Sequence, residues 1–307
     1  MPMLSRVADS LYWMGRYIER AEHMARVLEV SRDLLIDLAS IDPEGAAAER
    51  RVAAAILGTP EASALDVVFD ATSPASLVSA VTLARENARQ VREVIAAEMW
   101  EHLNQAYWTL SEARSRSTDE SALPEVLTQI HTASYLWDGV TDASMPRGEG
   151  WLFLKLGKFV ERTDRVCRTI AVRLEAKQRV EPAGGSHENV AWVTLLRSCA
   201  ALDAYRKTHP NRVEGRSVLA FLAFSSEFPR TVRHSVTVAG DLARRLSAFH
   251  GRPDDDVARA FGRLSSRVEF AEPAELGVAA PASFFTDVAQ ANMIASSRLA
   301  RKYFLEG

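Results

Sequence analysis

The chain contains the same short helical pattern twice. Residues 15–26 read GRYIERAEHMAR, and residues 157–168 read GKFVERTDRVCR. A single offset of 142 (157 minus 15) aligns glycine, glutamate, arginine and acidic positions: Gly15 with Gly157, Glu19 with Glu161, Arg20 with Arg162, and Glu22 with Asp164. A pattern repeated at this distance predicts two related halves that are built around equivalent helices.

A second pair of segments extends the repeat. Residues 86–92 align with residues 227–233 at an offset of 141 (227 minus 86). This alignment matches acidic and basic positions in both segments: Glu86 with Glu227, Arg89 with Arg230, and Arg92 with Arg233. In the first of these segments Arg85, Arg89 and Arg92 are spaced so that they share one face of a helix.

Apolar spacing predicts an all-α fold. Between Leu4 and Leu28 apolar residues recur every three or four positions, which is the pattern of a helix packed on a core. Similar patterns or caps predict further helices at Ala46–Leu57, from Ser73 towards Ser115 with a kink or break, at Pro124–Val140, Trp151–Lys177, Trp192–Lys207 and Ser217–Phe224, from Glu227 onwards, and at Phe284–Phe304. No alternating strand pattern of useful length is present.

We therefore expect two tandem related helical bundles, the product of an internal duplication, packed into one helical body. The first half covers residues 1–141 and the second covers residues 151–307. Residues 142–150, which read DASMPRGEG, are the expected junction because proline and glycine interrupt helices.

Composition limits the classes of partner. The formal net charge is −3, so the chain lacks the basic excess that is typical of proteins binding nucleic acid or anionic membranes. No apolar run has the length of a membrane span, and the first residues lack a signal-peptide core. We expect a cytoplasmic protein in which Cys167 and Cys199 pack as small hydrophobic residues.

The charged residues of the repeats are the candidate site. If the two halves pack as expected, one cluster contains Glu19, Arg20, Glu22, Arg85, Glu86, Arg89, Arg92, Glu161, Arg162, Asp164, Arg230 and Arg233, together with Glu227. The simpler interpretation is a structural network, because a buried charge is costly unless it is paired. The alternative is a site for an anionic ligand, a phosphate or a peptide carboxylate, because arginine forks match the geometry of both groups.

A di-metal carboxylate site is a third interpretation. The segments Glu19-x-x-Glu22-His23 and Glu98-x-x-Glu101-His102 are similar to the ligand motifs of ferritin-like bundles. In both segments, however, the histidine stands four residues after the first glutamate instead of three, and the second copy has Arg165 in place of His23. No phosphate-binding loop, dinucleotide motif or Cys-x-x-Cys pair is present, so we expect no cofactor.

The sequence resembles the bacterial alpha-E domain family, which is all-helical and is named for a Glu-Arg motif. The segments that carry the resemblance span nearly the whole chain: residues 4–22, 84–89 and 98–101, Leu156-Gly157 with Glu161-Arg162, Trp192 with residues 195–198, and residues 228–233. His23 departs from the asparagine that this family would have there. The resemblance implies that Glu19, Arg20, Glu161 and Arg162 are the family signature.

The resemblance also implies partners. Proteins of this family are encoded beside, or fused to, circularly permuted ATP-grasp ligases and transglutaminase-like peptidases, which suggests a system that forms or trims amide bonds. One hypothesis is that the chain is a non-catalytic component that binds the substrate, the ligase or both. The other is an enzyme that acts on peptide amides or carboxylates, with Glu19 or Glu161 as the acid or base.

Overall fold

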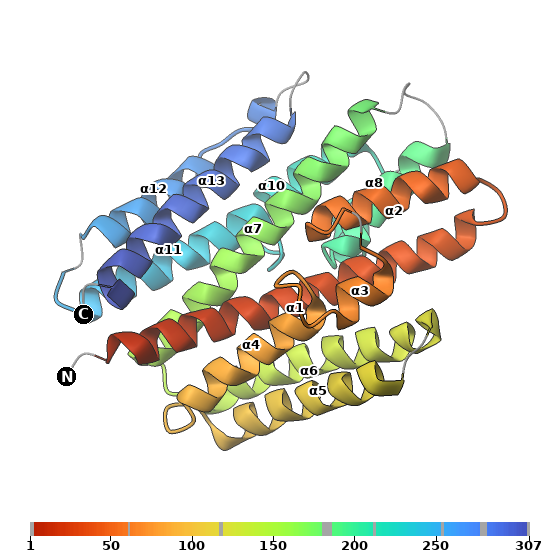
Figure 1. The fold of residues 1–307 in the computed structure, drawn as a ribbon. Coiled ribbons are helices and arrows are strands. Elements are labelled where there is room, and N and C mark those ends of the chain that lie inside the picture. Colours follow the sequence, from red (N-terminus) through yellow and green to blue (C-terminus); the bar gives the residue numbers. More distant parts are fainter. Residues whose placement is uncertain are drawn as a thin grey trace.

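Two long helices, α1 (Ser5–Leu38) and α7 (Glu149–Arg179), cross at the centre of the molecule (Figure 1). In this computed structural model the described residues are 3–60, 62–116, 119–179, 186–210, 213–252, 255–276 and 281–305. Within those ranges the chain is helical and contains no strand. The predicted all-α class is therefore confirmed for the described part of the chain.

Three helices pack around α1 and three pack around α7. α4 (Leu77–Gln90) and α6 (Leu123–Ser144) contact α1, and α5 (Ala97–Arg116) lies between them. In the same way α11 (Val232–Phe249) and α13 (Pro281–Ala300) contact α7, and α12 (Asp256–Glu269) lies between them. Figure 1 shows the two groups on opposite sides of the crossing.

Shorter elements complete the fold. They are α2 (Pro43–Leu57), α3 (Ala64–Phe69), α8 (Ser186–Ser198), α9 (Leu202–Thr208), α10 (Gly215–Phe224), the 3₁₀ turns Glu120–Ala122 and Pro273–Leu276, and the π-helical turn Arg301–Leu305 after α13. Both α2 and α8 contact α1 and α7, so they lie along the central pair. No helix among the described ranges is long and apolar enough to cross a lipid bilayer.

Several predicted helix boundaries differ from the structure. The first helix continues beyond Leu28 to Leu38. The helix expected from Ser73 begins at Leu77, where Ser76 accepts a hydrogen bond from the amide of Ser79, and a turn after Gln90 separates α4 from α5. The helix α12 was not predicted.

Two other predicted helices in the second half of the chain were wrong in detail. The segment Trp192–Lys207 is two helices, because Ala200 adopts a left-handed backbone conformation with φ of 54° and ends α8. α11 begins at Val232 and not at Glu227, because the hydroxyl of Thr231 caps it by accepting a hydrogen bond from the amide of His234.

The crossing of α1 and α7 depends on two glycines. A Cβ atom at Gly15 would lie 2.2 Å from the carbonyl oxygen of Leu154, and one at Gly157 would lie 2.0 Å from the carbonyl oxygen of Tyr12. Both distances are shorter than any real contact, and both obstacles are backbone atoms. The backbones therefore approach each other at a separation that only glycine allows on either helix.

We expect Gly157→Ala to lower the free energy of unfolding by about 3 kcal/mol, because the added methyl group must push the two helices apart. Gly139→Ala is the matched control: Gly139 is exposed on α6 with no atom within 4 Å of the added Cβ. This control should stabilise the protein by about 0.5–1 kcal/mol through helix propensity. Urea unfolding measures both changes, and equal effects would contradict the proposed contact.

Candidate functional site

Two Glu-Arg pairs connect α1 to α7 in a crossed arrangement. Glu19 on α1 receives two hydrogen bonds from Arg162 on α7, with Nε at 2.6 Å from Oε1 and Nη2 at 2.7 Å from Oε2. In return, Arg20 on α1 donates to Glu161 on α7 from Nε at 2.6 Å and from Nη2 at 3.2 Å. Each glutamate therefore binds the arginine of the opposite helix and not the arginine next to it in the sequence.

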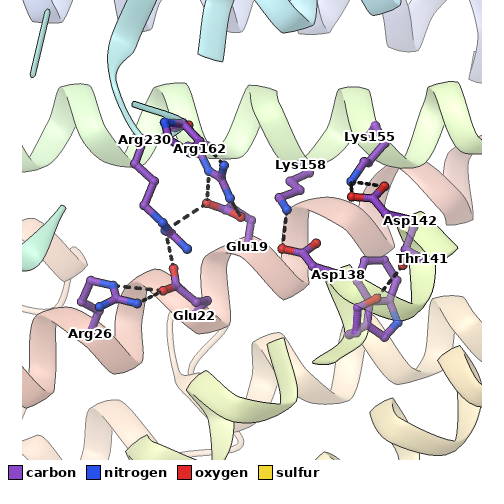
Figure 2. A network of polar contacts seen from close by, with 12 residues as sticks. Glu19, Glu22, Arg26, Asp138, Thr141, Asp142, Lys155, Lys158, Arg162 and Arg230 are labelled. Atoms are coloured by element: carbon purple, nitrogen blue, oxygen red, sulfur yellow. Dashed lines mark hydrogen bonds and ion pairs between the residues drawn. The ribbon is translucent and has the colours of Figure 1, made fainter. Parts of the chain in front are cut away.

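The carboxylate of Glu19 belongs to a wider network (Figure 2). Arg230 lies in the connection between α10 and α11, and its Nη1 is 2.7 Å from Oε2 of Glu22 and 3.5 Å from Oε1 of Glu19. Arg26 donates to Glu22 from Nε at 3.0 Å and also contacts the hydroxyl of Tyr135 on α6. The contacts of Glu19, Glu22 and Arg26 therefore connect α1 to α6, to α7 and to the segment before α11.

The carboxylate of Glu161 has three arginine neighbours. Besides Arg20, Arg16 donates from Nε at 2.7 Å, and Arg165 donates from Nε at 2.8 Å. The Glu161 side chain is fully buried, whereas the arginine side chains retain between 14% and 18% of their exposure. The guanidinium groups therefore separate the buried carboxylate from solvent.

Aromatic rings support the arginines on α1. The guanidinium of Arg16 lies 4.8 Å from the ring centroid of Trp13, and that of Arg20 lies 5.2 Å from the ring centroid of Tyr17. Such contacts orient a guanidinium while leaving some of its N–H groups available for hydrogen bonds.

The arginines determine the charge state of the glutamates. Burial raises the pKa of Glu19, but Arg162 and Arg230 outweigh burial and hold this pKa below its usual range. Burial also opposes ionisation of Glu22 and Glu161, yet the arginines beside them place both pKa values well below the usual range. All three carboxylates are therefore ionised at neutral pH, and none has the pKa of an efficient general acid or base there.

Asp164 behaves differently from the three glutamates. It is half-buried, and burial together with the charge of Glu161 raises the pKa of its carboxyl group. No ion pair within the described ranges involves it. Although it occupies the position equivalent to Glu22 in sequence, Asp164 therefore lacks the arginine contacts that Glu22 has.

A row of cations continues the network along α7 towards its N-terminus. Lys158 pairs with Asp138, and Lys155 pairs with Asp142 at 2.8 Å, both on α6 (Figure 2). With Arg162 these residues follow the spacing of one helix face. The same face of α7 thus contacts acidic side chains of both α1 and α6.

His23 is buried beside this network. Its Nε2 lies 3.1 Å from the hydroxyl oxygen of Thr169, and that hydroxyl already donates to the carbonyl oxygen of Arg165. The hydroxyl must therefore accept, which assigns the Nε2–H tautomer to His23. Burial, together with the positive charge of Arg165, lowers the pKa of His23 to about 3.

The arginine-rich helix of the first half does not join this cluster, so that part of the predicted constellation was wrong. Arg85 on α4 donates to Asn104 on α5 at 2.8 Å and packs on the rings of Trp100 and Tyr107. The other charged residues of this segment have local contacts or are exposed: Arg89 pairs with Glu86, and Arg92 lies over Trp100. α4 does pack on α1, but Arg85 contacts α5, Arg89 is exposed, and Arg92 lies in the turn after α4.

In the equivalent segment of the second half, residues 227–233, only some of the predicted charged residues join the cluster. Arg230 joins the cluster, whereas Glu227 is exposed, and Arg233 forms no ion pair within the ranges that the structure describes. Arg16 and Arg165, which do join it, were missed in the sequence. The signal for Arg165 was its position four residues after Glu161, a common helical ion-pair spacing.

The structure does not favour the metal interpretation. Among the described residues no group of three or more histidine, cysteine or acidic side chains is placed to hold a metal ion. Glu19 and Glu22 face arginines, and Glu98 and Glu101 are exposed on α5. The thiols are equally unreactive, since burial raises the pKa of Cys199 to about 12 and that of Cys167 well above its usual value.

Comparison with known proteins identifies relatives of the chain. A family model named Alpha-E, described as a predicted alpha-helical domain with a conserved ER motif, matches residues 3–304. Uncharacterised proteins of Mycobacterium bovis and of two Mycobacterium tuberculosis strains are 26% identical over 305 residues, a match that covers 88% of this chain and 33% of each relative. The chain thus spans about a third of the length of these relatives. No solved structure matches it.

We expect Arg162→Ala to destabilise the protein by about 3–5 kcal/mol, because it leaves Glu19 buried with only the more distant Arg230. Arg20→Ala is the comparison: Glu161 keeps Arg16 and Arg165, so the expected loss is about 1–2 kcal/mol. Chemical unfolding of both variants tests this order, and the opposite order would contradict the assigned pairing.

His23 should make stability depend on pH. An unfolded histidine gains its proton near pH 6.5, whereas folded His23 does so near pH 3, so the unfolded state binds more protons between these values and stability falls as the pH falls. Between pH 6.5 and 5 this loss is about 2 kcal/mol. His23→Gln should remove it, which unfolding curves measured at pH 7.5, 6.5 and 5 would show. Parallel pH profiles of the two proteins would refute this origin.

Proposed function

The chain belongs to the Alpha-E family, and from this membership we propose that it is a non-catalytic binding component of a system that forms or processes amide bonds. The observation that carries the proposal is the length of the relatives. Nearly the whole chain aligns with only a third of each relative, so the helical body corresponds to one part of a larger protein. A unit of this kind acts together with other domains or with partner chains.

The charge state of the cluster supports binding over catalysis. General acid–base catalysis is most efficient when the pKa of the group lies near the working pH. The arginines hold the pKa values of Glu19 and Glu161 below the usual range, so neither carboxylate is suited to transfer protons at neutral pH. An enzyme with Glu19 or Glu161 as acid or base remains the alternative.

The proposed partners follow from the family resemblance. They are a circularly permuted ATP-grasp ligase, which would activate a carboxylate as an acyl phosphate, and a transglutaminase-like protein, both in the cytoplasm. The substrate would be a peptide or another anion. The partly exposed guanidinium groups of Arg16, Arg20 and Arg165 provide hydrogen-bond donors that suit a carboxylate of such a substrate or of the ligase.

We further infer that the two groups of helices descend from one duplicated unit. The residues in contact at the crossing are related by the sequence offset of 142: Gly15 faces Leu154 as Gly157 faces Tyr12, and Glu19 binds Arg162 as Glu161 binds Arg20. A local two-fold axis between equivalent helices produces reciprocal contacts of this kind. In this proposal the halves are residues 1–141 and 151–307, and the break between α6 and α7 falls within the proposed junction 142–150.

The test is co-expression of the chain with a circularly permuted ATP-grasp ligase of the proposed kind, followed by affinity purification and product analysis with ATP. We expect a stable complex, no turnover by the isolated chain, and product formation by the ligase that requires the chain. Turnover by the isolated chain that is lost in a folded Glu19→Gln or Glu161→Gln variant would establish the alternative enzyme. Absence of both a complex and an effect on the ligase would refute the proposal.

A further inference from the structure

A polar cavity of about 630 Å³ lies at one end of the molecule, away from the Glu-Arg cluster. It forms where the N-terminal ends of α1, α7 and α12 meet the C-terminal ends of α11 and α13, the end at which both chain termini lie in Figure 1. Ala8, which lines it, is eleven residues before Glu19 on α1, or roughly 16 Å along the helix axis. The cavity is therefore a separate site.

Three arginines from different elements line this cavity. Arg252 follows α11, Arg298 lies near the end of α13, and Arg301 begins the π-helical turn. All three are exposed, and none forms an ion pair with another residue that the structure describes.

The acidic residues around the cavity already have partners. Glu149 lies 2.8 Å from Nε2 of His250 and accepts a hydrogen bond from the amide of Met3 at 2.9 Å. Asp255 accepts from Lys302, whose ammonium group is also 3.5 Å from Asp256. The cavity therefore has an excess of positive charge, and the three arginines supply it.

A second arginine-lined groove, between α11 and α12, provides the contrast. Arg244 pairs there with Asp241 at 2.9 Å, and Arg267 pairs with Asp287 at 3.0 Å. Acidic neighbours thus neutralise part of that groove. In the terminal cavity Arg252, Arg298 and Arg301 form no such pair with any residue that the structure describes.

We propose that the terminal cavity binds a small ligand with several anionic oxygens, as phosphate or carboxylate groups. Its volume falls in the range of small-molecule sites, about 300–1,000 Å³, and exceeds what a single inorganic phosphate needs. Guanidinium groups from three elements hold two or more anionic groups at once through paired hydrogen bonds. The first turn of α1 contains no acidic residue, so the positive end of its dipole adds to the same field.

The test uses two defined probes, tripolyphosphate and citrate, titrated into the full chain by calorimetry at about 0.1 M salt. We expect one-to-one binding of at least one probe, and the preferred probe distinguishes phosphate from carboxylate ligands. Arg298→Gln and Arg301→Gln should each weaken binding about tenfold or more, because each removes a charged hydrogen-bond partner. Both side chains are exposed, so both variants should keep the wild-type melting temperature.

Arg263→Gln is the matched control. Arg263 is exposed on α12, lines the other groove and carries the same charge, so its loss should change the dissociation constant less than twofold. Equal weakening by Arg263→Gln and Arg298→Gln would show non-specific attraction to positive charge and would overturn the proposal. Failure of both probes to bind at millimolar concentration would overturn it as well. Because no partner protein is involved, neither result depends on the proposed function.

Discussion

The structure depends on two buried carboxylates whose bidentate arginine partners lie across the contact between α1 and α7. Removing a carboxylate from water costs several kcal/mol unless charged donors replace the lost hydration. Glu19 obtains its bidentate donor, Arg162, from the opposite helix, and Glu161 obtains Arg16 and Arg20 from the opposite helix besides Arg165 of its own. Gly15 and Gly157 permit the close backbone approach at the same crossing. Two kinds of contact thus fix the register of the two helices: each glycine packs against the backbone of the other helix, and each glutamate binds an arginine of the other helix.

The two ends of this crossed arrangement have different surroundings, although their sequences are similar. Glu19 shares Arg230 with Glu22, and Arg162 also donates to the carbonyl oxygen of Pro229, so the segment before α11 is held against the centre. Glu161 instead faces three arginines that remain partly exposed. Arg162 is the most enclosed of these arginines, with 6% of its side chain exposed, so its pair with Glu19 suits a structural role. Arg230 keeps 14% exposure, the same as Arg16 beside Glu161, so partly exposed guanidinium groups occur at both ends.

The sequence predicted the all-α class, the central helices and the meeting of Glu19, Arg20, Glu161 and Arg162, because a repeated pattern on equivalent helices restricts how these helices pack. It did not place the arginines of α4. Helical spacing predicts that Arg85, Arg89 and Arg92 share a face, but Arg92 lies in the turn after α4, and spacing does not show which neighbour a helix face meets. Here α5 supplies Asn104 and the rings of Trp100 and Tyr107. The helix ends at Ala200 and Thr231 were also missed, because a left-handed backbone residue and a local cap interrupt an apolar pattern that continues across them.

The distribution of acidic partners separates arginines that hold the fold from arginines that are available to ligands. A bidentate pair such as Glu19 with Arg162 uses its donors internally, and burial makes exchange for an external anion costly. At the terminal cavity the arginines have no acidic partners of this kind among the described residues, because Glu149 pairs with His250 and Asp255 pairs with Lys302. The arginines beside them therefore keep their donors for a molecule from solution. In this fold the bidentate pair of Glu19 with Arg162 maintains the architecture, while arginines outside the repeat line the cavity that we propose for a small anion.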